Sequence, residues 1–232
     1  MLTLKVNPLK YLQIDHIRLE VHNYYDDFIL LKNSEVDILP LIGQAITEAK
    51  YDFIKEVIAT EVEILLKIRI PLTPHILTEL SNLNIKPQEL LPPYELQVHF
   101  GEDQDWAHIT SVSGLSKDAY IKELLASTLS VAMYGFMPGF VYLRGLPEHL
   151  HVPRKPNPDQ LIPASSFAIG SNYAGIYSVA SPGGWHVIGT VINQIFDKES
   201  MPPLHLKVGQ QIKIKAISKT ELSEPESHRS TK

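Results

Sequence analysis

The sequence predicts a mixed α+β protein, with a small α/β domain at residues 1–90 followed by a β-barrel domain at residues 91–220. Strand-like and helix-like apolar patterns share the first ninety residues, and the proline-rich passage NIKPQELLPPYE follows them. From Ser130 onward, short apolar segments are separated by Gly, Pro and Asn. This spacing is typical of a barrel or a sandwich rather than of crossover units.

The composition is that of a globular protein, because 44% of the 232 residues are hydrophobic and 20% are charged. A net charge of −5 gives no broad attraction to nucleic acid or to an anionic membrane. The absence of cysteine excludes disulfides, thiolate nucleophiles and Cys-based metal sites, and it fits a reducing cytoplasm. No apolar run approaches the ~18 residues of a membrane helix, so a soluble cytoplasmic protein is predicted.

Four strands and two helices are expected in the first domain. Alternation places Ile17, Leu19 and Val21 on one face of a strand at residues 14–21, and further strands are expected at residues 28–31, 53–58 and 62–70. Helical spacing predicts a helix at residues 35–50, in which Pro40 must lie early. In TPHILTELSNL, Thr73 suits a helix cap and Pro74 suits the first helical position.

The domain boundary is expected in the proline-rich passage at residues 85–93. Beyond it we expect a strand at residues 95–100 and a helix at residues 116–128. Ser116 is the expected N-cap of that helix, and Ile121, Leu124 and Leu125 are its expected inward side chains.

The barrel segments are short and apolar: VAMYGF, FVYLRGL, SFAIG, AGIYSVA, WHVIGTVI and QIKIKAI. In the last of these, Ile212, Ile214 and Ile217 are expected to face inward and the lysines to face water. The stretch GFMPGF at residues 135–140 mixes two glycines and a proline with bulky apolar side chains, which predicts a strand, a kink and a second strand. The polar residues 221–232 are expected to form a disordered tail.

Two stretches are candidates for ligand binding. SPGGW at residues 181–185 permits a tight turn that presents Trp185 and backbone amides to an anion, or else a barrel turn in which Trp185 fills the core. Strand alternation would point His186 away from Trp185, so that one lines a cleft and the other is buried. In VPRKPNPDQLIPASS, Arg154 suits a carboxylate or a phosphate, the alternative being a solvated arginine.

Other polar clusters carry weaker signals. The spacing of His149 and His151 suits one strand face, but no third ligand is near in sequence, so no metal site is predicted. Glu102, Asp103 and Asp105 beside Trp106 are expected to form a solvated turn, the alternative being a base or a cation site. There is no Walker loop, dinucleotide-binding motif, nucleophile elbow or zinc-protease motif, so no complete catalytic set is visible.

Four blocks resemble successive motifs of the KipI / allophanate hydrolase subunit 1 family, to which the B subunit of bacterial 5-oxoprolinase belongs: GFMPGFVYLRGL, HVPRKPNPDQLIPASSFAIG, AGIYSVASPGGWHVIGT and PPLHLKVGQQIKI. The resemblance is strong from about Ser130 to Ile217 and covers the first ninety residues only by the order of elements. It implies that the barrel is cyclophilin-like. The expected fold is therefore a small α/β domain followed by a cyclophilin-like β-barrel domain.

The resemblance implies a subunit of an ATP-dependent 5-oxoprolinase, which opens 5-oxo-L-proline to L-glutamate with ATP as co-substrate. The implied partners are the carboxyltransferase-like C subunit of that enzyme and a third oxoprolinase subunit. An alternative within the same family is a KipI-like inhibitor of a sensor histidine kinase, which would be an interaction module without catalysis. A prolyl isomerase activity would rest on fold analogy alone.

The family motifs also imply a set of cleft or substrate-binding residues, to which we add the adjoining His186, and they leave the catalytic residues unassigned. The set comprises Arg154, Ser166, Gly175, Tyr177, Ser181, Pro182, Gly183, Gly184, Trp185 and His186.

The chain also departs from the family at several positions. Leu124 replaces a histidine and Asp159 replaces a second arginine, which removes a proton-transfer group and an anion partner. Further replacements are Tyr173 and Ala174 for Gln-Thr, Ser178 for a proline, and His99 and Phe100 for Cys and Tyr. These replacements fit either an enzyme subunit whose substrate differs from that of the family or a protein that binds a partner without catalysis.

Overall fold

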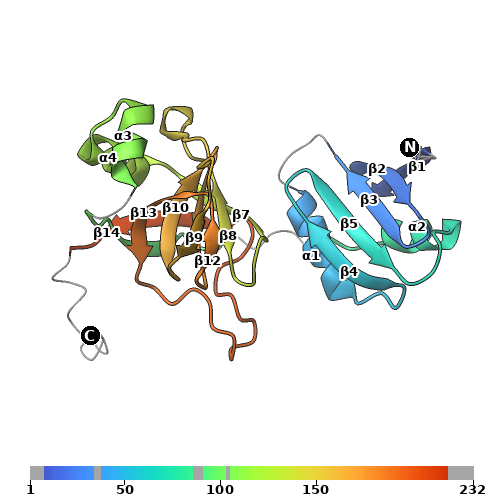
Figure 1. Ribbon diagram of the computed structural model, residues 1–232. Helices are drawn as coiled ribbons and strands as arrows, with labels where there is room; N and C mark the ends of the chain where they lie inside the picture. Colours follow the sequence, from blue (N-terminus) through green and yellow to red (C-terminus); the bar gives the residue numbers. More distant parts are fainter. Residues whose placement is uncertain (1–7, 34–37, 86–90, 103–104, 219–232) are drawn as a thin grey trace. The chain divides into compact units, whose positions relative to one another are not determined.

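The computed structural model describes residues 8–33, 38–85, 91–102 and 105–218, and the chain divides into two compact units, Met1–Glu89 and Leu90–Lys232 (Figure 1). Residues 86–90 of the expected boundary passage and the expected tail at 221–232 lie outside the described residues. None of the helices within the described ranges combines the length and the apolar character that a membrane crossing requires.

The first unit contains a five-stranded antiparallel sheet in the order β1-β2-β3-β5-β4. The strands are β1 (Pro8–Ile14), β2 (Ile17–Tyr24), β3 (Phe28–Lys32), β4 (Ile54–Ala59) and β5 (Glu63–Ile68). The four predicted strands are confirmed, but Ile14 ends a preceding strand and does not begin β2. Sequence reasoning missed β1 because Leu12 and Ile14 alone show too little alternation without their pairing to β2.

Two helices, α1 (Leu39–Ala49) and α2 (Pro74–Ser81), cover one face of this sheet. Apolar side chains of both helices join those of the strands in a single buried cluster, for example Ile42 and Ile76 with Leu19. α2 begins as predicted, because the Thr73 hydroxyl accepts a hydrogen bond from the Ile76 N–H at 3.4 Å. The opposite face of the sheet carries mainly polar side chains, as the alternating burial along β2 indicates.

The second unit is a closed barrel in the order β10-β11-β8-β7-β14-β6-β13, which confirms the predicted barrel. Its strands are β6 (Tyr94–His99), β7 (Leu129–Tyr134), β8 (Val141–Arg144), β10 (Ser166–Gly170), β11 (Tyr173–Ile176), β13 (His186–Val191) and β14 (Gln211–Ala216). In β14, Ile212 and Ile214 are buried while Lys213 and Lys215 are exposed, as predicted. Ile217 lies beyond the end of β14 and is only half-buried.

Two helices, α3 (Trp106–Ser113) and α4 (Lys117–Ala126), lie together at one end of the barrel, drawn in green in Figure 1. α4 has the predicted cap, since the Ser116 hydroxyl accepts a hydrogen bond from the Ala119 N–H at 3.2 Å. Leu124 is fully buried, whereas Ile121 and Leu125 are only partly buried. α3 was not predicted, because the acidic residues before it favoured a turn.

The stretch GFMPGF has the predicted form of a strand, a kink and a strand, since β7 ends at Tyr134 and β8 begins at Val141. Phe140 is 1% exposed and belongs to a buried cluster of the barrel. Phe136 has a positive φ of 66° and is 63% exposed, and its ring meets that of Phe140 edge-to-face at 5.5 Å. Only one of the two phenylalanines therefore belongs to the buried cluster.

Candidate functional site

Arg154 and the turn that ends at Trp185 lie side by side. Two short strands outside the barrel, β9 (Asp159–Ile162) and β12 (Ser181–Gly183), pair with each other. Next to this pair, the Lys155 N–H donates a hydrogen bond to the Gly184 carbonyl at 2.7 Å. The Arg154 guanidinium carbon then lies 5.6 Å from the centre of the Trp185 ring, within the range of a cation–π contact. We call this surface the Arg154–Trp185 face.

Trp185 is 5% exposed and is held by other aromatic rings. Phe140 and Tyr142 each meet it edge-to-face with ring centres 5.5 Å apart. Its ring also lies against Gly170 and Gly175, because a Cβ at either position would overlap the indole. Trp185 is therefore a core residue, as the second alternative for SPGGW predicted, and it also supports Arg154. Anion binding by the turn stays a prediction.

Tyr177 belongs to the same cluster and packs edge-to-face on Phe140, with ring centres 4.9 Å apart. Burial raises the pKa of Tyr177 to about 12, while a backbone hydrogen bond from Trp185 acts in the opposite direction. A Cβ on Gly183 would overlap the Tyr177 hydroxyl, so Gly183 allows a close approach of β12 to the tyrosine. The phenol is therefore neutral at ordinary pH.

The remaining sequence-predicted residues occupy backbone roles around this cluster. Ser166 is buried in β10, and its carbonyl accepts the Tyr177 N–H at 2.9 Å. Ser181 bonds to the carbonyl of the adjacent Pro182 at 3.1 Å, and Pro182 is exposed. Of these residues, Gly184 adjoins the Arg154–Trp185 face, because its carbonyl accepts the Lys155 N–H.

His186 and Trp185 are both buried, whereas alternation predicted that one of them lines a cleft. Its Nε2 lies 3.0 Å from the Pro153 carbonyl, and its ring stacks on that of His108 with centres 4.4 Å apart and an angle of 12°. Burial is the main cause that lowers the pKa of His186 below its usual value.

Sequence reasoning missed an ion-pair cluster beside the face. Lys155 Nζ lies 2.7 Å from a carboxylate oxygen of Asp105 and 2.6 Å from one of Asp159. Burial disfavours the charged amine, but the two carboxylates outweigh it, so the pKa of Lys155 is raised. Asp105 also accepts the Val187 N–H at 2.8 Å, which corrects the expectation that it belongs to a solvated turn. Asp159 thus serves as the partner of Lys155, where the family resemblance implied a second arginine.

His149 and His151, which were expected on one face of a strand, do not lie in a strand. His149 lies in a short 3₁₀ helix (Glu148–Leu150) and faces Glu123 at 3.8 Å, whereas His151 bonds to the Leu146 carbonyl at 2.8 Å. Within the described ranges, no three His, Cys, Asp or Glu side chains gather as metal ligands.

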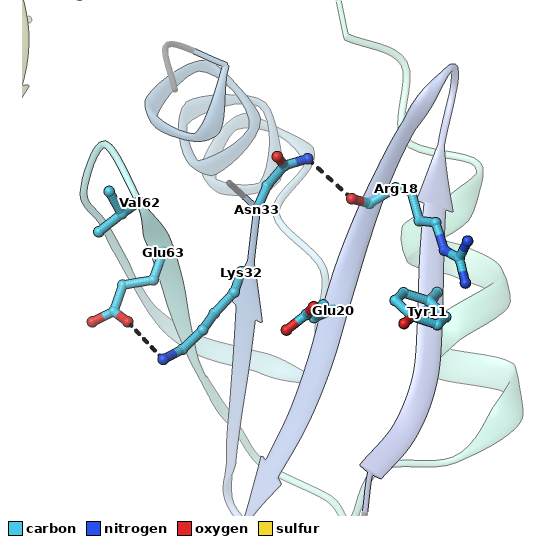
Figure 2. A pocket seen from close by; sticks show the side chains of 7 residues that line it. All are labelled: Tyr11, Arg18, Glu20, Lys32, Asn33, Val62 and Glu63. Carbon is cyan, nitrogen blue, oxygen red and sulfur yellow. Dashed lines mark hydrogen bonds and ion pairs between the residues drawn. The ribbon is translucent and has the colours of Figure 1, made fainter. Parts of the chain in front are cut away.

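A second candidate is a pocket of about 470 Å³ on the polar face of the first unit (Figure 2). It is lined by Tyr11, Arg18, Glu20, Lys32, Asn33, Val62 and Glu63. Tyr11, Glu20, Lys32 and Glu63 are successive cross-strand partners in the sheet, so their charges alternate along one row. Lys32 and Glu63 pair at 3.5 Å, and Arg18 lies 3.4 Å from the centre of the Tyr11 ring. This is the arrangement of a solvated sheet face whose charges balance one another.

The fold and the site together define a mixed α+β protein whose closed barrel holds a guanidinium against an aromatic cluster. The sequence model described as carboxyltransferase domain, subdomain C and D, matches residues 34–206, and the chain belongs to this family.

The curated relatives extend this result. Over 121 residues the chain is 37% identical to the 5-oxoprolinase B subunit of Haemophilus influenzae, a match that covers 51% of this chain and 57% of that protein. Over 110 residues it is 40% identical to the 5-oxoprolinase B subunit of Escherichia coli O157:H7, a match that covers 47% of this chain and 50% of that protein. The chain thus spans about half the length of these relatives. They confirm the predicted resemblance to 5-oxoprolinase B subunits and do not favour the kinase-inhibitor alternative.

A solved structure supports the fold. The crystal structure of a protein called TTHA0988 matches with a TM-score of 0.73 and 24% identity, over 82% of this chain and 40% of that one. At this identity the likeness concerns the fold alone.

Proposed function

We propose that this chain is a cytoplasmic subunit of an ATP-dependent 5-oxoprolinase, which acts with a carboxyltransferase-like C subunit and a third subunit. The observation that carries the proposal is the similarity to two curated 5-oxoprolinase B subunits, joined to a guanidinium held on an aromatic face. In the reaction, one water molecule opens the lactam of 5-oxoproline to glutamate, while a second hydrolyses ATP to ADP and phosphate.

The Arg154–Trp185 face suits the chemistry of this substrate. 5-Oxoproline is a small ring that carries one carboxylate, and a guanidinium binds a carboxylate through two parallel N–H···O bonds. Arg154 is exposed, so its donors are accessible, and the adjoining Trp185 ring fixes the plane near which the carboxylate would bind. Arg154 is therefore the proposed binding residue for the substrate carboxylate.

ATP requires more positive charge than this face offers. Lys155 is the nearest amine in sequence, and two carboxylates already hold it. A single guanidinium poorly balances a triphosphate, whose binding sites usually combine backbone amides, cations and a metal ion. We therefore assign ATP binding mainly to another subunit. We also assign to a partner the proton transfer that opens the lactam. Leu124 stands where the family has a histidine, and leucine cannot transfer a proton.

The test is to coexpress this chain with a carboxyltransferase-domain partner and the third subunit, and to measure phosphate and glutamate release from 5-oxoproline and ATP. Replacing Arg154 with Ala should raise KM by roughly 10- to 100-fold, the usual effect of losing a charge-assisted hydrogen bond. The matched control is Arg69→Ala, because Arg69 is an exposed arginine of the first unit. It should leave KM and kcat unchanged.

Two results would count against the proposal. A stable complex that turns over no cyclic amide would remove the 5-oxoprolinase activity. An active complex in which Arg154→Ala behaves like Arg69→Ala would remove the carboxylate role of Arg154 and leave the activity itself standing.

A further inference from the structure

The segment Pro153–Lys155 belongs to no strand, yet it is fixed at both ends. At one end, the Pro153 carbonyl lies 3.0 Å from Nε2 of His186. At the other end, the Lys155 N–H bonds to Gly184 at 2.7 Å and its amine pairs with Asp105 and Asp159. Arg154 lies between these two anchors, so its position on Trp185 depends on them.

The first anchor defines the protonation state of the imidazole. A carbonyl oxygen can only accept a hydrogen bond, so Nε2 of His186 must carry the hydrogen. In the neutral ring Nδ1 is then a bare nitrogen, and it is buried without a hydrogen-bond partner. A proton added at Nδ1 would therefore place a positive charge in a buried position with no acceptor for it.

α3 holds the ring from the other side. Asp105, at the start of α3, accepts the Val187 N–H at 2.8 Å, and its own N–H donates to the Val187 carbonyl at 3.0 Å. These two bonds fix the residue after His186 and bring His108 of α3 onto its ring. The ring is thus confined between the Pro153 carbonyl and α3.

The charges around His186 partly cancel. The hydrogen bond to the Pro153 carbonyl and the charge of Asp105 favour a protonated ring, whereas the charges of His108 and Lys155 disfavour it. Asp159 acts through its pair with Lys155, and Asp103 lies outside the described residues. Burial is the larger influence and lowers the pKa of His186 from 6.5. The folded arrangement is thus fully stable above the unfolded pKa of about 6.5, and it loses stability as the pH falls below that value.

We infer that neutral His186 is a positioning residue, which holds Arg154 on Trp185 through the Pro153 carbonyl, and that protonation of its Nδ1 releases Arg154. The consequence for substrate binding rests on the proposed function, whereas the conformational coupling of His186 to Arg154 does not.

The test uses the full chain labelled with 5-fluorotryptophan, which gives two fluorine resonances because the chain has two tryptophans. Trp106→Phe assigns them, and Arg154→Ala defines the shift of the Trp185 resonance when the guanidinium is removed. His186→Leu, which lacks the donor, should move this resonance in the same direction. His186→Gln, which keeps an N–H donor but cannot titrate, should leave it in place.

A pH titration adds an independent readout. Between about pH 8 and the usual histidine pKa of about 6.5 the Trp185 resonance should stay in place. Below that value it should move towards the Arg154→Ala position in the unsubstituted chain but not in His186→Gln. The control is His205→Gln, since His205 is an exposed histidine that bonds to the Gln194 carbonyl. It should titrate like the unsubstituted chain.

Binding of 5-oxoproline at neutral pH should weaken by roughly 10-fold in His186→Leu and change little in His186→Gln. The inference is overturned if folded His186→Leu keeps the original Trp185 resonance, or if His186→Gln titrates like the unsubstituted chain. If His186→Leu does not fold, the His186→Gln titration alone decides. If the unsubstituted chain does not bind 5-oxoproline, the proposed substrate fails, and the fluorine shifts still decide the role of His186.

Discussion

The indole of Trp185 lies against two glycines from neighbouring barrel strands, Gly170 of β10 and Gly175 of β11. Neither glycine has the positive φ that would require glycine for backbone reasons. The requirement is one of space, because a Cβ on Gly175 would come within 2.6 Å of the Trp185 ring. A family motif position such as Gly175 therefore allows Trp185 to pack against the barrel strands.

Replacing Gly170 with Ala should destabilise the second unit by about 1–3 kcal/mol, because a methyl group forced into a packed core displaces its neighbours. Urea unfolding followed by tryptophan fluorescence measures the change. Gly135→Ala is the matched control, since its Cβ would meet Tyr142 at an ordinary distance of 3.6 Å. It should change the stability by less than about 1 kcal/mol. Equal effects of the two substitutions would contradict the packing argument.

At the scale of the element, a helix start could be predicted where the capping side chain lies within a few residues of the N–H that it binds. Thr73 and Ser116 each accept a hydrogen bond from an N–H three residues further on, at the start of α2 and α4. α3 lacked such a signal, because the Asp105 side chain makes no capping bond and instead joins Lys155 and Val187. A helix whose first residue is held by tertiary contacts is difficult to recognise from its sequence.

Ser116→Ala should lower the free energy of unfolding by about 1 kcal/mol, because one N–H at the start of α4 loses its acceptor. Ser116→Asp should keep most of the stability, since aspartate also caps helices well. Urea unfolding of the three proteins provides the comparison. If alanine and aspartate give the same midpoint, the hydroxyl does not act as a cap.

At the scale of the whole molecule, each of the two units buries apolar side chains of its own among the described residues. Leu19 is buried in the core of the first unit, and Leu143 in β8 of the barrel unit. Both tryptophans, Trp106 and Trp185, belong to the second unit. Tryptophan fluorescence therefore reports on the barrel unit, whereas far-ultraviolet circular dichroism reports on both units.

We expect Leu19→Ala and Leu143→Ala to separate the two units in urea unfolding. Each substitution should lower the free energy of unfolding of its own unit by about 2–5 kcal/mol, because it removes buried apolar surface and leaves a cavity. Leu143→Ala should lower the midpoint seen by tryptophan fluorescence. Leu19→Ala should lower a transition seen by circular dichroism and leave the fluorescence midpoint in place. An equal shift of the fluorescence midpoint in both variants would mean that the two units unfold together.

Much of the fold could be predicted from local pattern. Alternation located β2 and β14, and the repeated Gly, Pro and Asn located the barrel. The edge strand β1 was missed because Leu12 and Ile14 alone show too little alternation without the pairing to β2. The helix α3 was missed because the residue before it is held by contacts with the distant Lys155 and Val187.

For the site, the sequence by itself determined which residues are present: Arg154, the SPGGW turn, the glycines and His186. It also determined the family, through motifs that remain recognisable residue by residue. Only the tertiary structure decided that Arg154 lies on Trp185, that Lys155 is held by Asp105 and Asp159, and that His186 binds the Pro153 carbonyl. The physical reason is the separation in sequence over which each interaction acts. Periodicity and capping act between residues a few positions apart, whereas ring contacts and buried ion pairs depend on strand order and register, which bring distant segments together.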